Sequence, residues 1–172
     1  MKINKIKIKN FRSTRTTEFA TSDFNIAVGQ NNCGKTNFFE AIQFFYNGLA
    51  RGQNLTELKY KRNPENEILV ELEFLGAQQG AENMQNEANQ TKIKNALGEN
   101  DAVIISRSSS DVKKRTFIVN GEEVNPGTGF DKALNDFLPK FEYVTRGRLT
   151  KRKLKYGSVK KADNVTNKFL MV

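Results

Sequence analysis

The sequence predicts an α/β fold organised around one phosphate-binding loop, and three observations support this. Residues 29–36 fit the pattern G-x-x-x-x-G-K-[ST], in which backbone N–H groups surround phosphate groups. Residues 24–28 before the loop are an apolar run typical of a buried strand, and residues 36–49 after it have helical periodicity. A strand, a glycine loop and a helix N-terminus in that order direct a helix dipole at a phosphate.

Within the loop, the chemistry of the pattern assigns two side chains. The ammonium of Lys35 is expected to reach the β- and γ-phosphates of a nucleotide, and the hydroxyl of Thr36 to ligate Mg²⁺. The plainer alternative is a glycine turn that joins a strand to a helix and binds nothing.

Two strands are expected before the loop. Residues 2–9 alternate apolar Ile6 and Ile8 with lysines, which predicts a half-buried strand near a sheet edge, and residues 16–19 form its return strand. In the helix after the loop, an apolar stripe for sheet packing is expected, and glycines bracket its end. The stripe consists of Phe38, Ile42, Phe45 and Leu49.

The remainder of the chain alternates between strand and helix patterns. Residues 68–74 alternate Ile68, Val70, Leu72 and Phe74 with polar positions, which predicts a strand. Asn120-Gly121 is a hairpin turn signal. We further expect a helix that ends at Gly98, strands at 102–106 and 116–119, a helix at 130–138 and a last strand at 140–144.

Three segments carry a family resemblance. They are residues 9–13 (Lys-Asn-Phe-Arg-Ser), residues 24–25 (Phe-Asn) and residues 29–42, from Gly29 through the double Asn and the Thr-Asn pair to Glu-Ala-Ile. Together they resemble the start of an ABC-type ATPase head of the SMC/RecF group. They are most similar to OLD-family ATPases, which couple such a head to a Toprim nuclease. The resemblance is sharp over residues 2–48, diffuse over 67–144 and lost beyond.

The resemblance implies an incomplete P-loop NTPase fold of the ABC-ATPase-head type, a mixed sheet with flanking helices, and the ligands ATP and Mg²⁺. It also implies that Arg12 lies near the nucleotide; the alternative is a solvated loop arginine. The remaining nucleotide-binding residues implied by the same matching are Gly29, Asn31, Asn32, Cys33, Gly34, Lys35, Thr36 and Asn37.

Hydrolysis by such a head needs an acidic strand end and a signature loop, and neither is found in the sequence. Glu71 follows an apolar run, but its alternation indicates a solvent-facing strand residue. No catalytic residue is therefore predicted, and this chain alone is expected to bind ATP but barely to hydrolyse it. We expect an ATP-binding N-terminal segment of an OLD/RecF/SMC-like ATPase in DNA processing or phage defence. The alternative is a non-enzymatic ATP- or nucleic-acid-binding module that acts through a partner chain. A compact P-loop kinase is disfavoured by the two leading strands.

The composition excludes several classes of enzyme and favours one cellular setting. The chain has no histidine, which excludes Ser-His-Asp and Cys-His catalysis, and it has a single cysteine, which favours a reducing, cytoplasmic setting. No apolar run approaches 18 residues, so no membrane span is expected.

The positive charge is unevenly distributed along the chain. The net charge is +9, and +8 of it falls in residues 143–172, which contain nine Lys/Arg and one acid. We expect a domain at residues 1–144 and a basic, disordered tail at 145–172. The tail could contact DNA or be a solvated segment without a partner. Besides ATP, the expected partners are DNA and either a second copy or a chain that supplies the rest of the ATPase.

Overall fold

The computed structural model describes residues 1–30, 33–124 and 127–141 and the backbone of residues 168–171. The strands are β1 (Lys2–Phe11), β2 (Thr14–Ala20), β3 (Phe24–Ala27), β4 (Leu69–Leu75), β5 (Ala102–Ser108), β6 (Thr116–Val119), β7 (Glu122–Val124) and β8 (Lys168–Met171). The helices are α1 (Lys35–Asn47), α2 (Leu55–Leu58), the 3-10 helix η1 (Tyr60–Arg62), α3 (Ala77–Glu82), α4 (Glu87–Leu97) and α5 (Phe130–Phe137).

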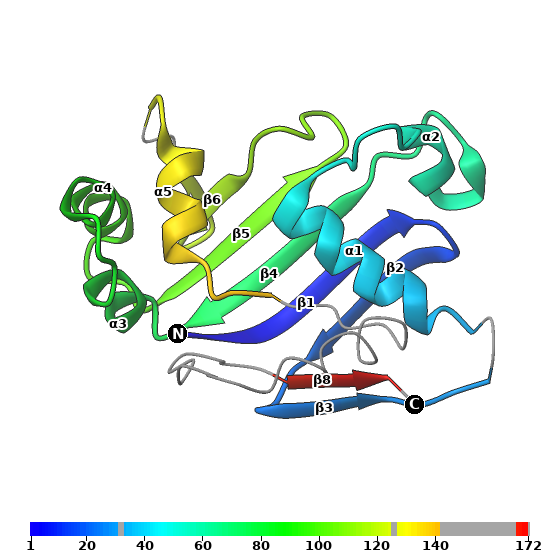
Figure 1. The fold of residues 1–172 in the computed structure, drawn as a ribbon, viewed down its shortest axis with the longest axis horizontal. Helices are drawn as coiled ribbons and strands as arrows, with labels where there is room; N and C mark the ends of the chain where they lie inside the picture. Colours follow the sequence, from blue (N-terminus) through cyan, green and yellow to red (C-terminus); the bar gives the residue numbers. More distant parts are fainter. Residues whose placement is uncertain (31–32, 125–126, 142–167, 172) are drawn as a thin grey trace, which may run out of the picture.

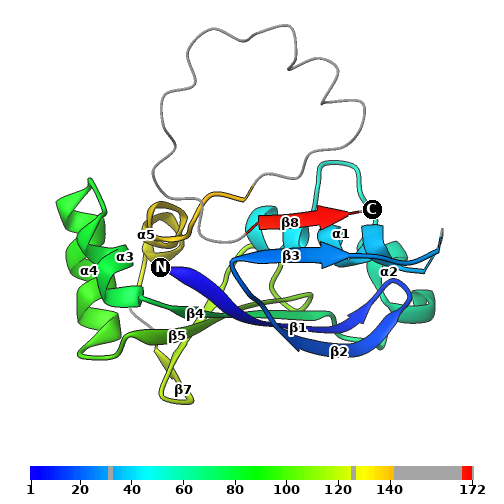
Figure 2. The ribbon, with the colours of Figure 1, turned by 90° about the horizontal axis from the view of Figure 1, so that it is seen from below.

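The strands form two sheets. Six strands pair in the order β2-β1-β4-β5-β6-β7, with every neighbouring pair antiparallel. The strand before the loop, β3, belongs instead to a separate two-stranded sheet, where it pairs in parallel with β8. Helices α1 and α5 and the two-stranded sheet lie on the same side of the six-stranded sheet (Figures 1 and 2). The predicted α/β class is confirmed.

The core is formed by the six-stranded sheet with α1, and residues of α3, α4 and α5 also contribute to it. The apolar residues predicted to face inward from β4 and the residue before it, Ile68, Val70, Leu72 and Phe74, are all fully buried. Glu71 points to the opposite face of the sheet, where its carboxylate forms an ion pair of 2.9 Å with Lys7. This contact raises the pKa of Lys7, first through its hydrogen bond to Glu71. The surface interpretation of Glu71 is therefore confirmed.

Helix α1 buries a broader face than the predicted stripe. Phe39, Ala41 and Phe44 are buried together with the expected Ile42 and Phe45, whereas Phe38 and Leu49 are only partly buried. The reason is that α1 packs against β1, β4 and β5 together, and a face this wide takes more than one row of side chains.

Elements with strong local signals occur where they were predicted. The hairpin between β6 and β7 turns at Asn120 (φ 52°) and Gly121 (φ 81°), both left-handed as a two-residue hairpin of this kind requires. The predicted helix that ends at Gly98 is α4. It begins at Glu87, where the side chain of Asn86 caps it by accepting a hydrogen bond from the amide of Asn89.

The prediction that the strand before the loop is buried was wrong. Phe24, Ile26 and Val28 share one face of β3 and its extension, and they are 54%, 52% and 76% exposed. An apolar run predicts that another element covers it, but the run does not tell which part of the chain, or which other molecule, supplies that element. Among the described residues, nothing covers this face.

The C-terminal predictions are only partly open to comparison. Lys140 and Phe141 are not in a strand, and residues 142–144 of the predicted last strand lie outside the described residues. Most of the predicted disordered tail also lies outside them, so that prediction stands untested there. Residues 168–171 differ from it, because they form β8 beside β3. None of the helices in the described ranges is long and apolar enough to cross a membrane.

Candidate phosphate-binding site

The two motif glycines differ in how strongly the loop between β3 and α1 requires them. Gly34 caps α1 with φ 96° and ψ 4°, a left-handed conformation that strains any residue with a Cβ. At Gly29, an added Cβ would lie 2.6 Å from Sγ of Cys33. The backbone therefore requires glycine at position 34, whereas a side chain at position 29 would displace the thiol of Cys33.

Lys35 folds back over this loop. Its Nζ donates a hydrogen bond to the carbonyl oxygen of Gly29 and another, of 3.1 Å, to the carbonyl oxygen of Gln30. It also lies 3.9 Å from Sγ of Cys33, which is exposed. A positive charge is thus held inside the loop. The predicted site residues Asn31 and Asn32 lie outside the described residues.

The start of α1 fits an anion. The first backbone bond of the helix runs from the amide of Phe38 to the carbonyl of Gly34 (3.0 Å). The preceding amides, those of Lys35, Thr36 and Asn37, have no carbonyl within the helix to bond. No acidic residue stands in the first turn, so the positive end of the helix dipole is unopposed there.

Thr36, the predicted ligand of Mg²⁺, is exposed at the second position of α1. In the part of the chain that the structure describes, no group of three or more His, Cys, Asp or Glu side chains could hold a metal ion. A magnesium ion bound with a nucleotide keeps several waters and takes phosphate oxygens. One protein hydroxyl is therefore compatible with such an ion.

The turn between β1 and β2 packs against the start of α1. Ser13 Oγ accepts a hydrogen bond of 2.7 Å from Nδ2 of Asn37, and a Cβ on Gly34 would lie 3.5 Å from the same oxygen. Arg12 in this turn has a left-handed backbone (φ 49°). Its Nε forms an ion pair of 2.5 Å with Oε2 of Glu40 on α1. The structure thus brings the predicted residues Arg12, Gly34 and Asn37 together.

Two residues of this arrangement, Ser13 and Glu40, were not assigned a role from the sequence. Ser13 stood in the resembling segment 9–13, and Glu40 follows Thr36 by four residues, which places both on one face of the helix. The helical spacing was therefore a usable signal for Glu40. The contact of Ser13 with Asn37 joins residues 24 positions apart and had no such signal.

The far end of α1 is also held. Arg107 on β5 donates from Nε to the carbonyl of Phe45 (2.8 Å) and from Nη1 to the carbonyl of Val112. Burial lowers the pKa of Arg107 to about 10. Gly48 ends the helix at this point, where a Cβ would lie 2.8 Å from the carbonyl oxygen of Val112. Fixed at both ends, α1 presents its N-terminus to the loop in a defined position.

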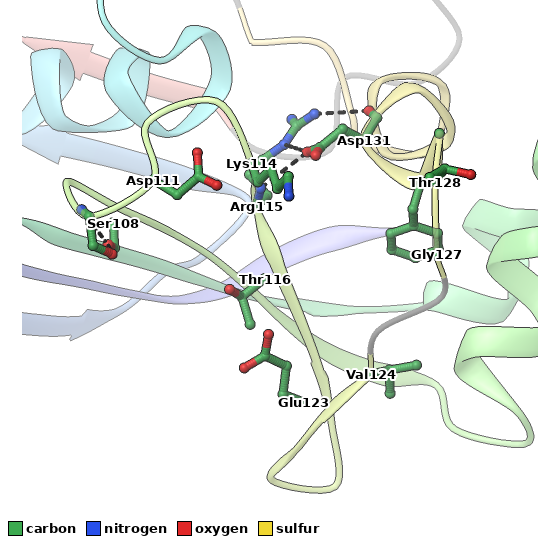
Figure 3. Close-up of a pocket in the computed structure, with 13 residues that line it drawn as sticks. Ser108, Asp111, Lys114, Arg115, Thr116, Glu123, Val124, Gly127, Thr128 and Asp131 are labelled. Atoms are coloured by element: carbon green, nitrogen blue, oxygen red, sulfur yellow. Dashed lines mark hydrogen bonds and ion pairs between the residues drawn. The ribbon is translucent and has the colours of Figure 1, made fainter.

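A separate cavity of about 640 Å³ lies between the β5–β6 connection and the start of α5 (Figure 3). Its wall contains the buried Arg115, which forms an ion pair of 3.5 Å with Asp131 and donates a hydrogen bond of 2.5 Å to Asn135. Burial lowers the pKa of Arg115. The carboxylates of Asp111 and Glu123, together with Asp131, outnumber the cationic Lys114 and Arg115 in the lining, so this cavity does not have the character of a phosphate site.

Three solved structures show which fold this is. A structure from "Structural biochemistry of ATP-driven dimerization and DNA stimulated activation of SMC ATPases" is 20% identical, with a TM-score of 0.59 over 91% of this chain and 93% of that one. An Smc head domain with a coiled coil and joint from Pyrococcus yayanosii is 22% identical, with a TM-score of 0.57 over 88% and 29% of the two chains. An Smc head bound to the C-winged helix domain of ScpA is 20% identical, with a TM-score of 0.51 over 79% and 39%.

These likenesses confirm the fold of an ABC-type ATPase head of the SMC kind. The chain spans most of the first structure but well under half of the other two. Residues 1–164 match the AAA ATPase domain family, and the chain belongs to this family. Membership of an ATPase family implies ATP binding. None of the curated proteins is similar enough to this chain to count as a match.

Proposed function

We propose that residues 1–144 are the N-terminal lobe of an OLD/RecF/SMC-like ATPase head that binds Mg·ATP in the loop at residues 29–37. The observation that carries this proposal is the loop itself, in which the ammonium of Lys35 is held by the carbonyls of Gly29 and Gln30 at the N-terminus of α1. Lys35 would bind the β- and γ-phosphates, Thr36 the magnesium ion, and Arg12 a further phosphate or the ribose.

The exposed face of β3 supports a lobe that is completed by further structure. Parallel sheets occur almost only with both faces covered, yet Phe24, Ile26 and Val28 are more than half exposed. Further strands and helices, from a longer chain, a second copy or a partner chain, would bury this apolar face. The same observation favours the second candidate, a non-enzymatic ATP- or nucleic-acid-binding module that acts through a partner.

More specifically, we propose that the protein acts on DNA, in DNA processing or phage defence. It is supported by the OLD-like residues around the loop and by the charge of +8 in residues 143–172. One of the structural neighbours above concerns the DNA-stimulated activation of SMC ATPases. A basic segment of this kind would bind the phosphate backbone without sequence preference.

Cys33 offers a direct test of loop occupancy, because it is the single cysteine of the chain and is exposed. Its Sγ lies 3.9 Å from Nζ of Lys35, so a phosphate bound to Lys35 should shield the thiol. We expect saturating Mg·ATP to slow alkylation of Cys33 at least about tenfold, which corresponds to roughly 90% occupancy of the loop. The measurement is the rate of mass gain with a maleimide.

In the Lys35→Ala variant, at the same concentration of Mg·ATP, this protection should fall to about twofold or less, which separates loop binding from a general effect of the nucleotide on the reagent. Equal alkylation rates with and without Mg·ATP in the unaltered chain would contradict the proposed site.

The basic tail predicts salt-dependent binding to DNA. Contacts between eight cations and phosphates would weaken DNA affinity roughly 10³- to 10⁵-fold between about 50 and 200 mM salt. Changing these residues to Gln should remove most of the affinity at low salt while residues 168–171 stay intact to pair with β3. The residues are Arg146, Arg148, Lys151, Arg152, Lys153, Lys155, Lys160 and Lys161.

Fluorescence anisotropy with duplex DNA measures this effect. A control with four substitutions of the same kind replaces Lys2, Lys5, Lys7 and Lys9 of β1 with Gln and should retain DNA binding. Undiminished binding by the tail variant would refute the role of the tail and leave the nucleotide site untouched.

A further inference from the structure

We propose that Glu40 is a positioning residue that holds the guanidinium of Arg12 by its Nε and leaves both terminal nitrogens for the nucleotide. Arg12 Nε lies 2.5 Å from Glu40 Oε2. Within the described ranges, Nη1 and Nη2 of Arg12 make no hydrogen bond to another residue. This inference rests on the proposed function, because it concerns how Arg12 serves a nucleotide bound in the adjacent loop.

The backbone delivers Arg12 to this position. Its amide donates a hydrogen bond of 2.6 Å to the carbonyl of Leu58, and its φ of 49° is left-handed. On one side Phe11 is buried in the core, and on the other Ser13 is bonded to Asn37 of α1. Left-handed backbone at a residue other than glycine persists where the surroundings over-determine it, and it is common at ligand sites.

The two atoms that form the ion pair are shielded from water. The side chains of Arg12 and Glu40 are 34% and 30% exposed, but Nε and Oε2 themselves are buried from solvent and make no hydrogen bond, so their contact is an ion pair. Removing one partner of such a pair leaves a buried charge without compensation. Without Glu40, the guanidinium would therefore turn outward to water and lose its place beside the loop.

Glu40 also ties this guanidinium to the helix that begins with Lys35. It follows Thr36 by four residues, so it lies one helical turn above the start of the helix. The same rigid helix thereby positions two cationic groups, the ammonium of Lys35 and the guanidinium of Arg12. A planar guanidinium held at Nε presents its remaining donors as a fork suited to phosphate oxygens.

The test is a double-mutant cycle read out by the affinity for ATP and for adenosine. Because fixing an arginine costs much rotamer freedom, we expect Glu40→Ala to weaken ATP binding about three- to tenfold. Adenosine affinity should not change, since it has no phosphate. Arg12→Ala should show a similar loss for ATP, and the Arg12→Ala/Glu40→Ala double variant should bind no worse than Arg12→Ala alone. Glu40→Gln keeps an acceptor and should be intermediate.

The matched control is Glu18→Ala, which breaks an exposed ion pair of 3.1 Å with Lys5 on the opposite face of the sheet and should leave both affinities unchanged. Thermal unfolding shows whether each variant is folded at the assay temperature. If Glu40→Ala is not, the isosteric Glu40→Gln carries the cycle.

The inference is overturned if the folded Glu40 variant binds ATP as well as or better than the unaltered chain. It is also overturned if the loss persists in the Arg12→Ala background, which would indicate a structural effect. Loss of ATP binding in Lys35→Ala alongside either outcome would leave the nucleotide site standing. No ATP binding by the unaltered chain would remove the proposed function and this inference together.

Discussion

Lys35→Ala is expected to weaken ATP binding roughly 10- to 100-fold, the size of one or two lost hydrogen bonds to a charged group. The ammonium is the one side-chain cation held inside the loop by described residues, through the carbonyls of Gly29 and Gln30. The domain should stay folded, because Lys35 is outside the buried core. Isothermal titration calorimetry with ATP measures the loss, and the thermal unfolding midpoint checks the fold.

Lys5→Ala is the appropriate comparison. It removes one positive charge from the outer face of the sheet, where Lys5 pairs with Glu18, and should leave ATP affinity unchanged. If Lys35→Ala binds ATP as tightly as the unaltered chain, the loop does not hold the phosphates and the proposed site is wrong.

The second expected result is that this chain of 172 residues binds ATP but turns it over far more slowly than about 1 s⁻¹, the low end of common enzyme rates. Phosphoryl transfer depends on positioning and on stabilisation of charge on the transferring group. Arg12 supplies some of that charge in our proposal. The sequence contains neither an acidic strand end that follows an apolar run nor a signature loop.

The loss of such groups costs about 10² to 10³ in rate each, so two missing groups leave little above background. A second copy of the chain would not restore them, because it lacks the same parts. Steady-state phosphate release from the purified chain, with Lys35→Ala as the measure of contamination, tests this. Turnover near 1 s⁻¹ that depends on Lys35 would show that groups we did not recognise complete the site.

Much of the fold was predictable because alternation of side chains is a local property of a strand. In residues 68–74, every second residue is apolar, and those residues are fully buried in β4. The turn at Asn120-Gly121 was equally local, since it needs only residues that tolerate a left-handed backbone. Helix α2, in contrast, is four residues long and amid polar sequence, too short for any periodicity to show.

In the candidate site, too, some residues could be predicted from local sequence and others could not. The loop from Gly29 to Asn37 is contiguous, so its glycines, its lysine and its threonine could be assigned from spacing alone. Glu40 could have been noticed from its place on the helix, but its partner Arg12 comes from a different element. Pairing across elements depends on how the β1–β2 turn packs on α1, and no spacing in the chain encodes that distance.

The sequence by itself thus determined the class of fold and the position of the glycine loop, and it predicted the roles of Lys35 and Thr36, because each of these depends on neighbours within a few residues. The tertiary structure alone decided that β3 leaves the main sheet to pair with β8, and that its apolar face with Phe24 and Ile26 is open. It also decided that Arg12 meets Glu40. The physical reason is that burial and ion pairing are set by what packs across a surface, and the free energy of that packing comes from residues far apart in the chain.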